Sequence, residues 1–192
     1  MGQRITVPRK RFGMETGMEL FSCFYPDVYL DSTYEIDFEA LYKKGYRGVI
    51  FDIDNTLVPH GAPADKRSIA LFERLRKIGF ESVLLSNNKE PRVKSFSDQV
   101  KSRYLYKAGK PGKKGYLKAM ELMKTGPGAT VFVGDQLFTD VWGAKRTGIL
   151  TYLVKPIHPK EEIQIVLKRR LERIVLFFYK RSLCRKGEQK WK

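Results

Sequence analysis

The sequence has few cysteines and no long apolar segment. Its two cysteines, Cys23 and Cys184, lie far apart and lack the spacing of metal ligands or of a disulfide framework. Such sparse usage is typical of a reducing compartment. The longest apolar run, residues 174–179, is far shorter than the ~20 residues that span a bilayer, and no secretory signal follows the N-terminal charges. These absences exclude a disulfide-rich secreted scaffold and favour a cytoplasmic protein.

Acidic residues are scarce relative to basic ones. There are 37 Lys and Arg residues against 21 Asp and Glu residues, which gives a net charge of +16. Residues 1–11 contain four basic residues and no acidic one, and residues 155–192 contain twelve basic and four acidic residues. Basic ends of this kind bind nucleic acid or an anionic membrane surface. Because the sequence contains no recognised nucleic-acid-binding motif, we favour the membrane surface as a partner and do not expect nucleic acid to be one.

From residue 46 onwards, short apolar runs alternate with segments in which apolar residues recur at the spacing of a helix. The pattern predicts five buried strands, at residues 46–51, 83–85, 104–106, 129–133 and 149–154. Helices are predicted over 64–78, after Pro91, and over 113–124, 137–147 and 161–181. This alternation predicts an α/β fold with a five-stranded parallel sheet covered on both faces. We expect a basic, aromatic N-terminal extension at 1–35, a core at 36–158, and a basic amphipathic helix and tail at 159–192.

Polar residues follow four of the predicted strands. They are Asp52, Asp54 and Thr56 after the first strand, Ser86 and Asn87 after the second, Lys110 after the third, and Asp135 and Asp140 after the fourth. Each group has an ordinary alternative as a turn, a helix cap or a surface lysine. Together they provide a nucleophile, a hydroxyl donor, a cation and paired metal-binding acids. Because parallel strands carry their active sites at the carboxyl edge, we expect one phosphoryl-transfer site there.

These motifs resemble those of the haloacid dehalogenase superfamily of phosphohydrolases, over about residues 46–155. The resemblance implies a Rossmann-like three-layer fold and a Mg²⁺ cofactor. It implies that Asp52 attacks phosphorus, that Asp54 acts as general acid and base, and that Lys110 holds the phosphoryl group and the nucleophile. An aspartyl-phosphate intermediate on Asp52 follows from these roles.

The remaining motif residues receive binding roles from the same resemblance. Thr56 supports the loop, and Ser86 with Asn87 donates hydrogen bonds to the phosphoryl oxygens. Asp135 binds Mg²⁺ together with Asp52 and the backbone carbonyl of Asp54, and Asp140 steadies the metal or its waters. Oxygen ligands of this kind are those that Mg²⁺ prefers.

Superfamily members commonly carry a cap domain inserted after the first or second motif. Here one loop, one helix and one strand fill the interval from Asp54 to Ser86, and a helix and a short strand fill that from Ser86 to Lys110. Neither interval has room for a large cap, so we expect an open site that suits a large or surface-bound substrate. Residues 57–63 form a short flap beside the site, and His60 there is either a substrate contact or an exposed loop residue.

The predicted C-terminal helix has a second feature that is typical of membrane-binding proteins. Its apolar residues Ile163, Val166, Leu167, Leu171, Ile174, Val175 and Phe178 fall on one face, and the basic residues Lys168, Arg169, Arg170 and Arg173 lie mostly elsewhere. Such a helix lies in a membrane interface, or else its apolar face packs on the sheet. Both alternatives stay open from the sequence.

A narrower resemblance concerns the residues ahead of the first motif. Tyr25-Pro26-Asp27, followed by Ile36-Asp37, Leu41 and Gly45, is similar to the YqeG family of capless phosphatases (subfamily IIIA), which includes phosphatidylglycerophosphate phosphatases. The resemblance implies dephosphorylation of phosphatidylglycerophosphate by a protein held peripherally on the inner face of the membrane. The alternatives are a phosphatase of a soluble nucleotide, sugar phosphate or phosphoprotein, and a nucleic-acid- or ribosome-associated module with a vestigial site.

Overall fold

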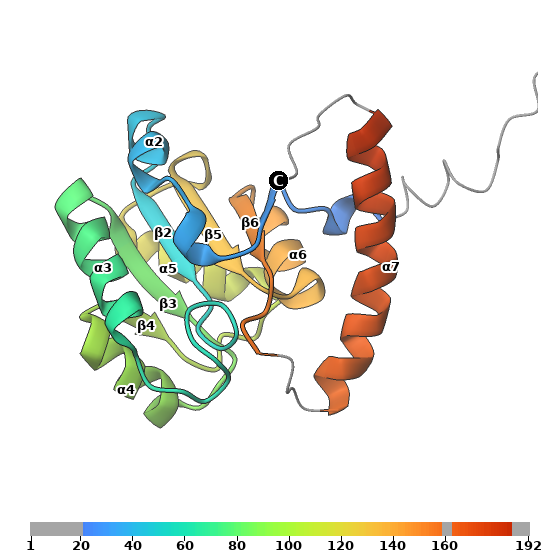
Figure 1. Cartoon of the computed structure of the whole chain (residues 1–192). Coiled ribbons are helices and arrows are strands. Elements are labelled where there is room, and N and C mark those ends of the chain that lie inside the picture. The colour runs from blue at the N-terminus through green and yellow to red at the C-terminus, as the bar shows by residue number, and fades with distance from the viewer. Residues whose placement is uncertain (1–20, 159–162, 186–192) are drawn as a thin grey trace, which may run out of the picture.

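A six-stranded parallel sheet forms the centre of the molecule in a computed structural model (Figure 1). The structure describes residues 21–158 and 163–185. The strands are β1 (Val28–Leu30), β2 (Gly48–Phe51), β3 (Glu81–Leu85), β4 (Arg103–Leu105), β5 (Thr130–Gly134) and β6 (Leu150–Val154). Their order in the sheet is β1-β6-β5-β2-β3-β4. The expected α/β fold with a parallel sheet is confirmed, but the expected number of five strands is wrong by one.

The additional strand is β1, which lies within residues 1–35. It pairs in parallel with β6 through the register Val28↔Tyr152. Asp27 anchors it, because the Asp27 Oδ2 atom accepts hydrogen bonds from the backbone N–H of Thr151 at 2.8 Å and from its Oγ1 at 2.7 Å. The Tyr25-Pro26-Asp27 segment therefore fastens the N-terminal part of the chain to the sheet.

Helices cover both faces of the sheet, so the fold has three layers (Figure 1). The helices α2 (Phe38–Lys43), α3 (Lys66–Ile78) and α4 (Glu90–Val100) lie on one face, and α5 (Lys113–Met123) and α6 (Trp142–Lys145) lie on the other. Alternation along β2 divides the core between them. Val49 and Phe51 pack among the side chains of α2, α3 and α4, whereas Ile50 packs against α5. The strands are therefore buried on both sides, as their near-continuous apolar runs indicate.

The predicted helix over 137–147 is divided in two. Its first half is the π-helical turn η4 (Leu137–Val141), and its second half is α6. Turns of this type occur often at functional sites. Three short 3₁₀ segments, η1 (Ser22–Phe24), η2 (Thr33–Glu35) and η3 (Pro127–Ala129), lie in the connections between the strands and helices or before β1.

The C-terminal helix α7 (Ile163–Arg185) stands against the β6 side of the molecule (Figure 1). Val175 and Tyr179 are buried, and Val175 packs with Leu137 and Val141 of η4. The side chain of Glu172 also accepts a hydrogen bond from the Leu137 N–H at 2.7 Å. The α7 side chains at 163–169 and 184–185, the expected basic segment 1–11 and the tail 186–192 lie outside the described residues.

The predicted apolar face of α7 is only partly covered. Val175 is 2% exposed, but Leu171 is 54% and Ile174 is 50% exposed, and Phe177 beside them is 57% exposed. The helix thus packs on the core through one part of that face and leaves the other part open. In the described residues, no helix combines the length and the apolar composition that a membrane crossing requires.

Candidate active site

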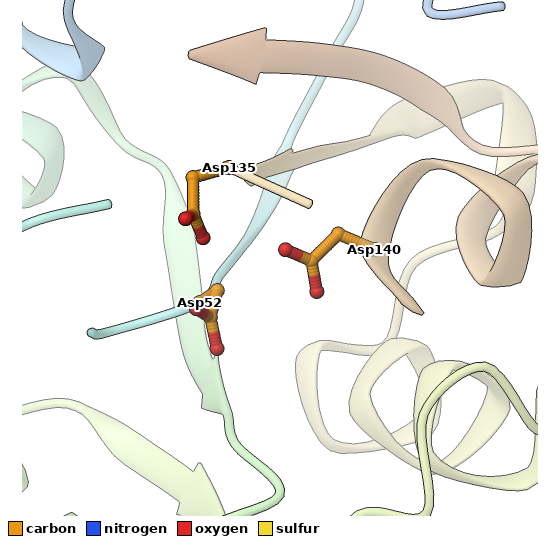
Figure 2. Close-up of side chains that lie close together, drawn as sticks. All are labelled: Asp52, Asp135 and Asp140. Atoms are coloured by element: carbon orange, nitrogen blue, oxygen red, sulfur yellow. The ribbon is translucent and has the colours of Figure 1, made fainter. Parts of the chain in front are cut away.

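Three carboxylates from separate segments meet at the carboxyl edge of the sheet. Asp52 follows β2, Asp135 follows β5, and Asp140 belongs to η4. All three residues are buried, and each offers an oxygen within 4.8 Å of the others. Figure 2 shows the three side chains directed toward a common space. Buried carboxylates repel one another unless a cation lies among them, so this arrangement fits a cation site.

Lys110 supplies one cation at this cluster. Its Nζ atom lies 2.6 Å from Oδ1 of Asp52 and 2.8 Å from Oδ1 of Asp140, and its side chain is 4% exposed. With all three carboxylates ionised, the cluster and the Lys110 ammonium group would together carry two negative charges. A single divalent ion would balance that charge, and the donor set consists only of oxygen atoms, as Mg²⁺ prefers.

The electrostatics of the cluster follow from its burial. Burial raises the pKa of Asp52 to about 7; Lys110 opposes the rise, and the Asp140 carboxylate adds to it. Burial alone would lower the pKa of Lys110, but the Asp140 and Asp52 carboxylates outweigh it and raise that pKa overall. Lys110 is therefore an ammonium ion, a fixed positive charge beside the Asp52 carboxylate.

A tight loop after β2 holds Asp52 in place. Asn55 adopts a left-handed conformation with φ of 62°, which asparagine tolerates better than most residues. The Thr56 hydroxyl donates to Oδ1 of Asp135 at 3.2 Å, which joins this loop to the end of β5. From η2, the Thr33 hydroxyl donates to the carbonyl oxygen of Thr56 at 2.8 Å, and the Tyr34 hydroxyl donates to that of Leu57 at 2.7 Å. The N-terminal segment thus buttresses the loop.

Asp140 depends on close packing around η4. A Cβ atom on Gly134 would lie 2.5 Å from Oδ2 of Asp140, so only glycine fits at the end of β5. The backbone N–H of Gln136 donates to Oδ2 of Asp140 at 3.1 Å. On the other side, the Tyr116 hydroxyl donates to the carbonyl oxygens of Thr139 at 2.8 Å and Asp140 at 3.2 Å. These contacts fix the turn that presents the carboxylate.

The second motif lies beside the Lys110 loop. Ser86 is buried, and its Oγ atom accepts a hydrogen bond from the Asn88 N–H at 3.2 Å. The Asn87 side chain donates from Nδ2 to the Lys110 carbonyl oxygen at 3.1 Å and accepts from the Lys110 N–H at 2.8 Å. The side-chain amide of Asn87 is therefore hydrogen-bonded to the backbone of Lys110. Its predicted contact with phosphoryl oxygens stays a prediction.

The Asp54 carboxylate is not a member of the cluster of three acids and forms its hydrogen bonds with other groups. Its Oδ1 atom accepts hydrogen bonds from the Gly61 N–H at 2.8 Å and from Nη2 of Arg92 at 2.9 Å, and its Oδ2 atom accepts from Nδ2 of Asn88 at 3.3 Å. Burial raises the pKa of Asp54, but the Gly61 N–H and Arg92 lower it more, so the net direction is downward. Asp54 is thus a carboxylate here, the form that acts as a general base, and it must gain a proton before it can act as the expected general acid.

The sequence does not indicate several of the residues that form hydrogen bonds with the site. Arg92, Tyr34 and Tyr116 lie far along the chain from the residues that they contact, and each is an ordinary residue type for its element. Gly134 directly precedes Asp135 in the sequence, but only the fold brings it against Asp140. Only proximity in space identifies this set.

The site has no cap over it within residues 52–110. The loop that follows Asp54, together with α3 and β3, accounts for the chain up to Ser86, and α4 and β4 account for the chain up to Lys110. In the flap at residues 57–63, Leu57 and Val58 are buried, Gly61 contacts Asp54, and His60 is exposed. The flap therefore borders the site without closing it.

Comparisons with known proteins agree with this geometry. The HAD-hydrolase-like family model matches residues 107–162. A solved structure from Vibrio cholerae that carries the name of a 3-deoxy-D-manno-octulosonate 8-phosphate phosphatase superposes with a TM-score of 0.50 at 14% identity, covering 80% of this chain and 93% of that one. At that identity the likeness shows the fold alone.

Sequence relatives are more informative. The "Probable phosphatase YqeG" of Bacillus subtilis is 37% identical over 169 residues, which cover 88% of this chain and 96% of that protein. "Phosphatidylglycerophosphate phosphatase 1, chloroplastic/mitochondrial" of Arabidopsis thaliana is 30% identical over 97% of this chain, which spans only 56% of the plant protein. With the parallel three-layer fold and the acids gathered at its carboxyl edge, these relatives assign the chain to the YqeG family of phosphatases in the haloacid dehalogenase superfamily, to which it belongs.

Proposed function

We propose that this phosphatase hydrolyses phosphomonoesters with Mg²⁺ through an aspartyl-phosphate on Asp52, and that its substrate is phosphatidylglycerophosphate at an anionic membrane surface. One observation carries the chemical part of the proposal. The carboxylates of Asp52, Asp135 and Asp140 lie within 4.8 Å of one another while Lys110 holds the first and the last of them. This arrangement supports the proposal, because it brings a carboxylate that could act as nucleophile, a cation and a possible metal-binding set into one buried place.

Asp52, Asp135 and Asp140 would hold the metal ion through carboxylate oxygens, with the backbone carbonyl of Asp54 as a further ligand. When bound, the ion supplies charge neutralisation for an anionic phosphate beside an anionic nucleophile. An all-oxygen set with open positions suits Mg²⁺, which keeps several of its waters. The excess of three carboxylates over one ammonium group in the cluster supports a divalent ion.

The chain's own residues account for the two chemical steps. Asp52 attacks phosphorus, and the bond from phosphorus to the ester oxygen breaks as a new bond to the Asp52 carboxylate forms. Lys110 stabilises the charge on the transferring group. Asp54, which is a carboxylate at rest, takes up a proton from solvent and passes it to the departing oxygen, and it afterwards takes a proton from the water that hydrolyses the aspartyl-phosphate. Ser86 binds the phosphoryl oxygens, and Thr56 and Asn87 position the Asp135 carboxylate and the Lys110 backbone.

Two observations support a lipid substrate. Relatives from Arabidopsis thaliana and Chlamydomonas reinhardtii, at 30% and 28% identity, carry the name phosphatidylglycerophosphate phosphatase 1. On α7, Leu171, Ile174 and Phe177 are each at least half exposed, and Arg170 and Arg173 beside them are exposed too. Apolar side chains flanked by basic ones are typical of helices that lie in a membrane interface, where each basic residue contributes about 1 kcal/mol near anionic lipid.

A phosphate-release screen with Mg²⁺ tests the proposal. Phosphatidylglycerophosphate in mixed micelles is compared with a nucleotide, a sugar phosphate and a phosphopeptide at equal phosphate concentration. We expect the highest kcat/KM for the lipid and loss of all turnover in the Asp52→Asn variant. Faster turnover of any soluble ester would reject the lipid substrate, and full activity in excess chelator would reject the role of the metal.

A further inference from the structure

Arg92 is a cation at the active site. The proposed catalytic mechanism assigns no role to it. It lies in the first turn of α4, directly after Pro91, and its side chain is 17% exposed. Its Nη2 atom donates to Oδ1 of Asp54 at 2.9 Å. The guanidinium also stands over the ring of Phe96, with 5.5 Å from Cζ to the ring centroid, and Phe96 is fully buried. The core thus fixes where this cation stands.

The hydrogen-bonding capacity of Arg92 is largely unused. A guanidinium carries five N–H donors, and the described contacts engage one nitrogen, Nη2. The Nε atom is buried without a hydrogen-bond partner. A buried donor that lacks a partner is costly. The arrangement therefore favours a ligand that accepts hydrogen bonds from the unused N–H groups of the guanidinium. An anionic oxygen pair matches that fork better than any neutral group.

Asp54 does not depend on Arg92 alone. Its carboxylate also accepts hydrogen bonds from the Gly61 N–H at 2.8 Å and from the Asn88 amide at 3.3 Å. Arg92 can therefore turn part of its guanidinium toward a ligand while Asp54 stays in position. Since Asp54 serves the departing oxygen, a ligand beside Arg92 lies on the leaving-group side of the phosphate.

We propose that Arg92 is a specificity-determining residue that binds a second anionic group of the substrate, located on its leaving group. The substrate class is then phosphomonoesters whose alcohol carries a phosphodiester or carboxylate a few bonds from the scissile oxygen. This inference rests on the proposed function for the site and deepens it. Phosphatidylglycerophosphate fits the class, because its glycerol separates the terminal phosphate from an internal phosphodiester.

Two matched substrate pairs test the inference. The first pair is a short-chain phosphatidylglycerophosphate and its analogue whose internal phosphodiester is methylated to an uncharged triester. The second pair is 3-phosphoglycerate and its methyl ester. Within each pair the alcohol backbone is the same and one charge differs. We expect wild-type kcat/KM to favour the charged member by roughly 10- to 100-fold, the size of a charge-assisted hydrogen bond or two.

The Arg92→Met variant should bring this ratio close to one, and Arg92→Lys should retain part of it. The control is Lys89→Met, which removes an exposed charge at the N-cap of α4 and should keep the wild-type ratio. If Arg92 acts only by positioning Asp54, both members of a pair slow equally, the ratio persists, and the inference is overturned. A wild-type ratio near one overturns it as well.

The two pairs separate this inference from the proposed function. Hydrolysis of the soluble pair without hydrolysis of the lipid pair rejects the lipid substrate, while the role of Arg92 is still decided by the ratio for the soluble pair. Hydrolysis of the lipid pair with an unchanged ratio in Arg92→Met rejects the inference and leaves the lipid substrate standing.

Discussion

Lys110 donates a hydrogen bond from its Nζ atom to Oδ1 of Asp140 at 2.8 Å, across 30 positions of the chain. The same ammonium contacts Asp52 at 2.6 Å, so one lysine connects the proposed nucleophile to the acid of η4. Its two carboxylate partners are buried, and a buried charge that loses its partner costs several kcal/mol. This lysine is therefore expected to support both the fold and the chemistry.

Replacement of Lys110 by Met should lower the free energy of unfolding by about 3–5 kcal/mol in the presence of a chelator, because buried carboxylates lose their cation. Added Mg²⁺ should recover part of the loss, since it supplies the missing positive charge. Urea unfolding with and without Mg²⁺ measures both effects. Lys118→Met, at an exposed lysine on α5 paired with Glu121, is the control and should change stability by less than about 0.5 kcal/mol. An unchanged unfolding free energy in Lys110→Met would contradict the account.

Replacement of Asp52 by Asn should reduce kcat by about a thousand-fold or more, because the amide cannot act as the nucleophile. The fold should persist, since the change removes one of three mutually repelling charges. Acid quenching of wild-type turnover followed by intact-mass analysis should reveal one added phosphoryl group, and the variant should show none. Asp98→Asn, at an exposed acid on α4, serves as the matched control. A phosphorylated Asp52→Asn protein would place the nucleophile elsewhere.

Divalent ions should stabilise the protein through the three acids. At a Mg²⁺ concentration of one hundred times Kd, a site present only in the folded state adds about 2.7 kcal/mol. Asp135→Asn should remove most of this gain, because one of the three ligands is lost. Thermal unfolding over a Mg²⁺ titration measures it, with calcium as a comparison ion. A gain of equal size in the variant would show that the ion binds elsewhere.

Removal of the Asp27 side chain should destabilise the fold without altering the chemistry. The Asp27→Ala change leaves the Thr151 N–H and hydroxyl without their acceptor, at a cost of about 1–3 kcal/mol. The kcat on a soluble ester should stay near the wild-type value below the unfolding temperature. Asp31→Ala, whose pair with Lys155 is solvent-exposed, should have little effect on either quantity. Equal stability of the two variants would reject the anchoring role of Asp27.

The three exposed apolar residues of α7, Leu171, Ile174 and Phe177, should determine how tightly the protein binds a membrane. Changing Leu171, Ile174 and Phe177 together to Ser removes three half-exposed apolar side chains, worth about 1 kcal/mol each in an interface. Binding to vesicles of anionic lipid should weaken by about 100-fold in co-sedimentation, while turnover of a soluble ester stays unchanged. Leu117→Ser, at a residue 52% exposed on α5, is the matched control. Equal vesicle binding by the triple variant would leave α7 without a membrane role.

Local patterns were enough to predict the parallel α/β architecture. Apolar runs such as 46–51 and the helical spacing over 64–78 reflect contacts that repeat along each element, so one sequence displays them. The motif residues could be predicted as one group for a related reason. The carboxyl ends of parallel strands meet at one edge, so Asp52, Lys110 and Asp135 must approach each other once the strands pair.

Other features depended on contacts between distant segments, which no local pattern records. The sixth strand, β1, is joined to the sheet through the contact of Asp27 with Thr151, which lies 124 positions further along the chain. Arg92 acquires its place from the packing of α4, which carries it to Asp54. Burial and neighbours also decided the electrostatics: they raise the pKa of Asp52 and lower that of Asp54, although both are the same residue type two positions apart. Residue types and their order thus predicted a phosphatase site, and tertiary packing decided which neighbours surround each of its side chains, because a side chain's dielectric surroundings and partners arise only when remote segments meet.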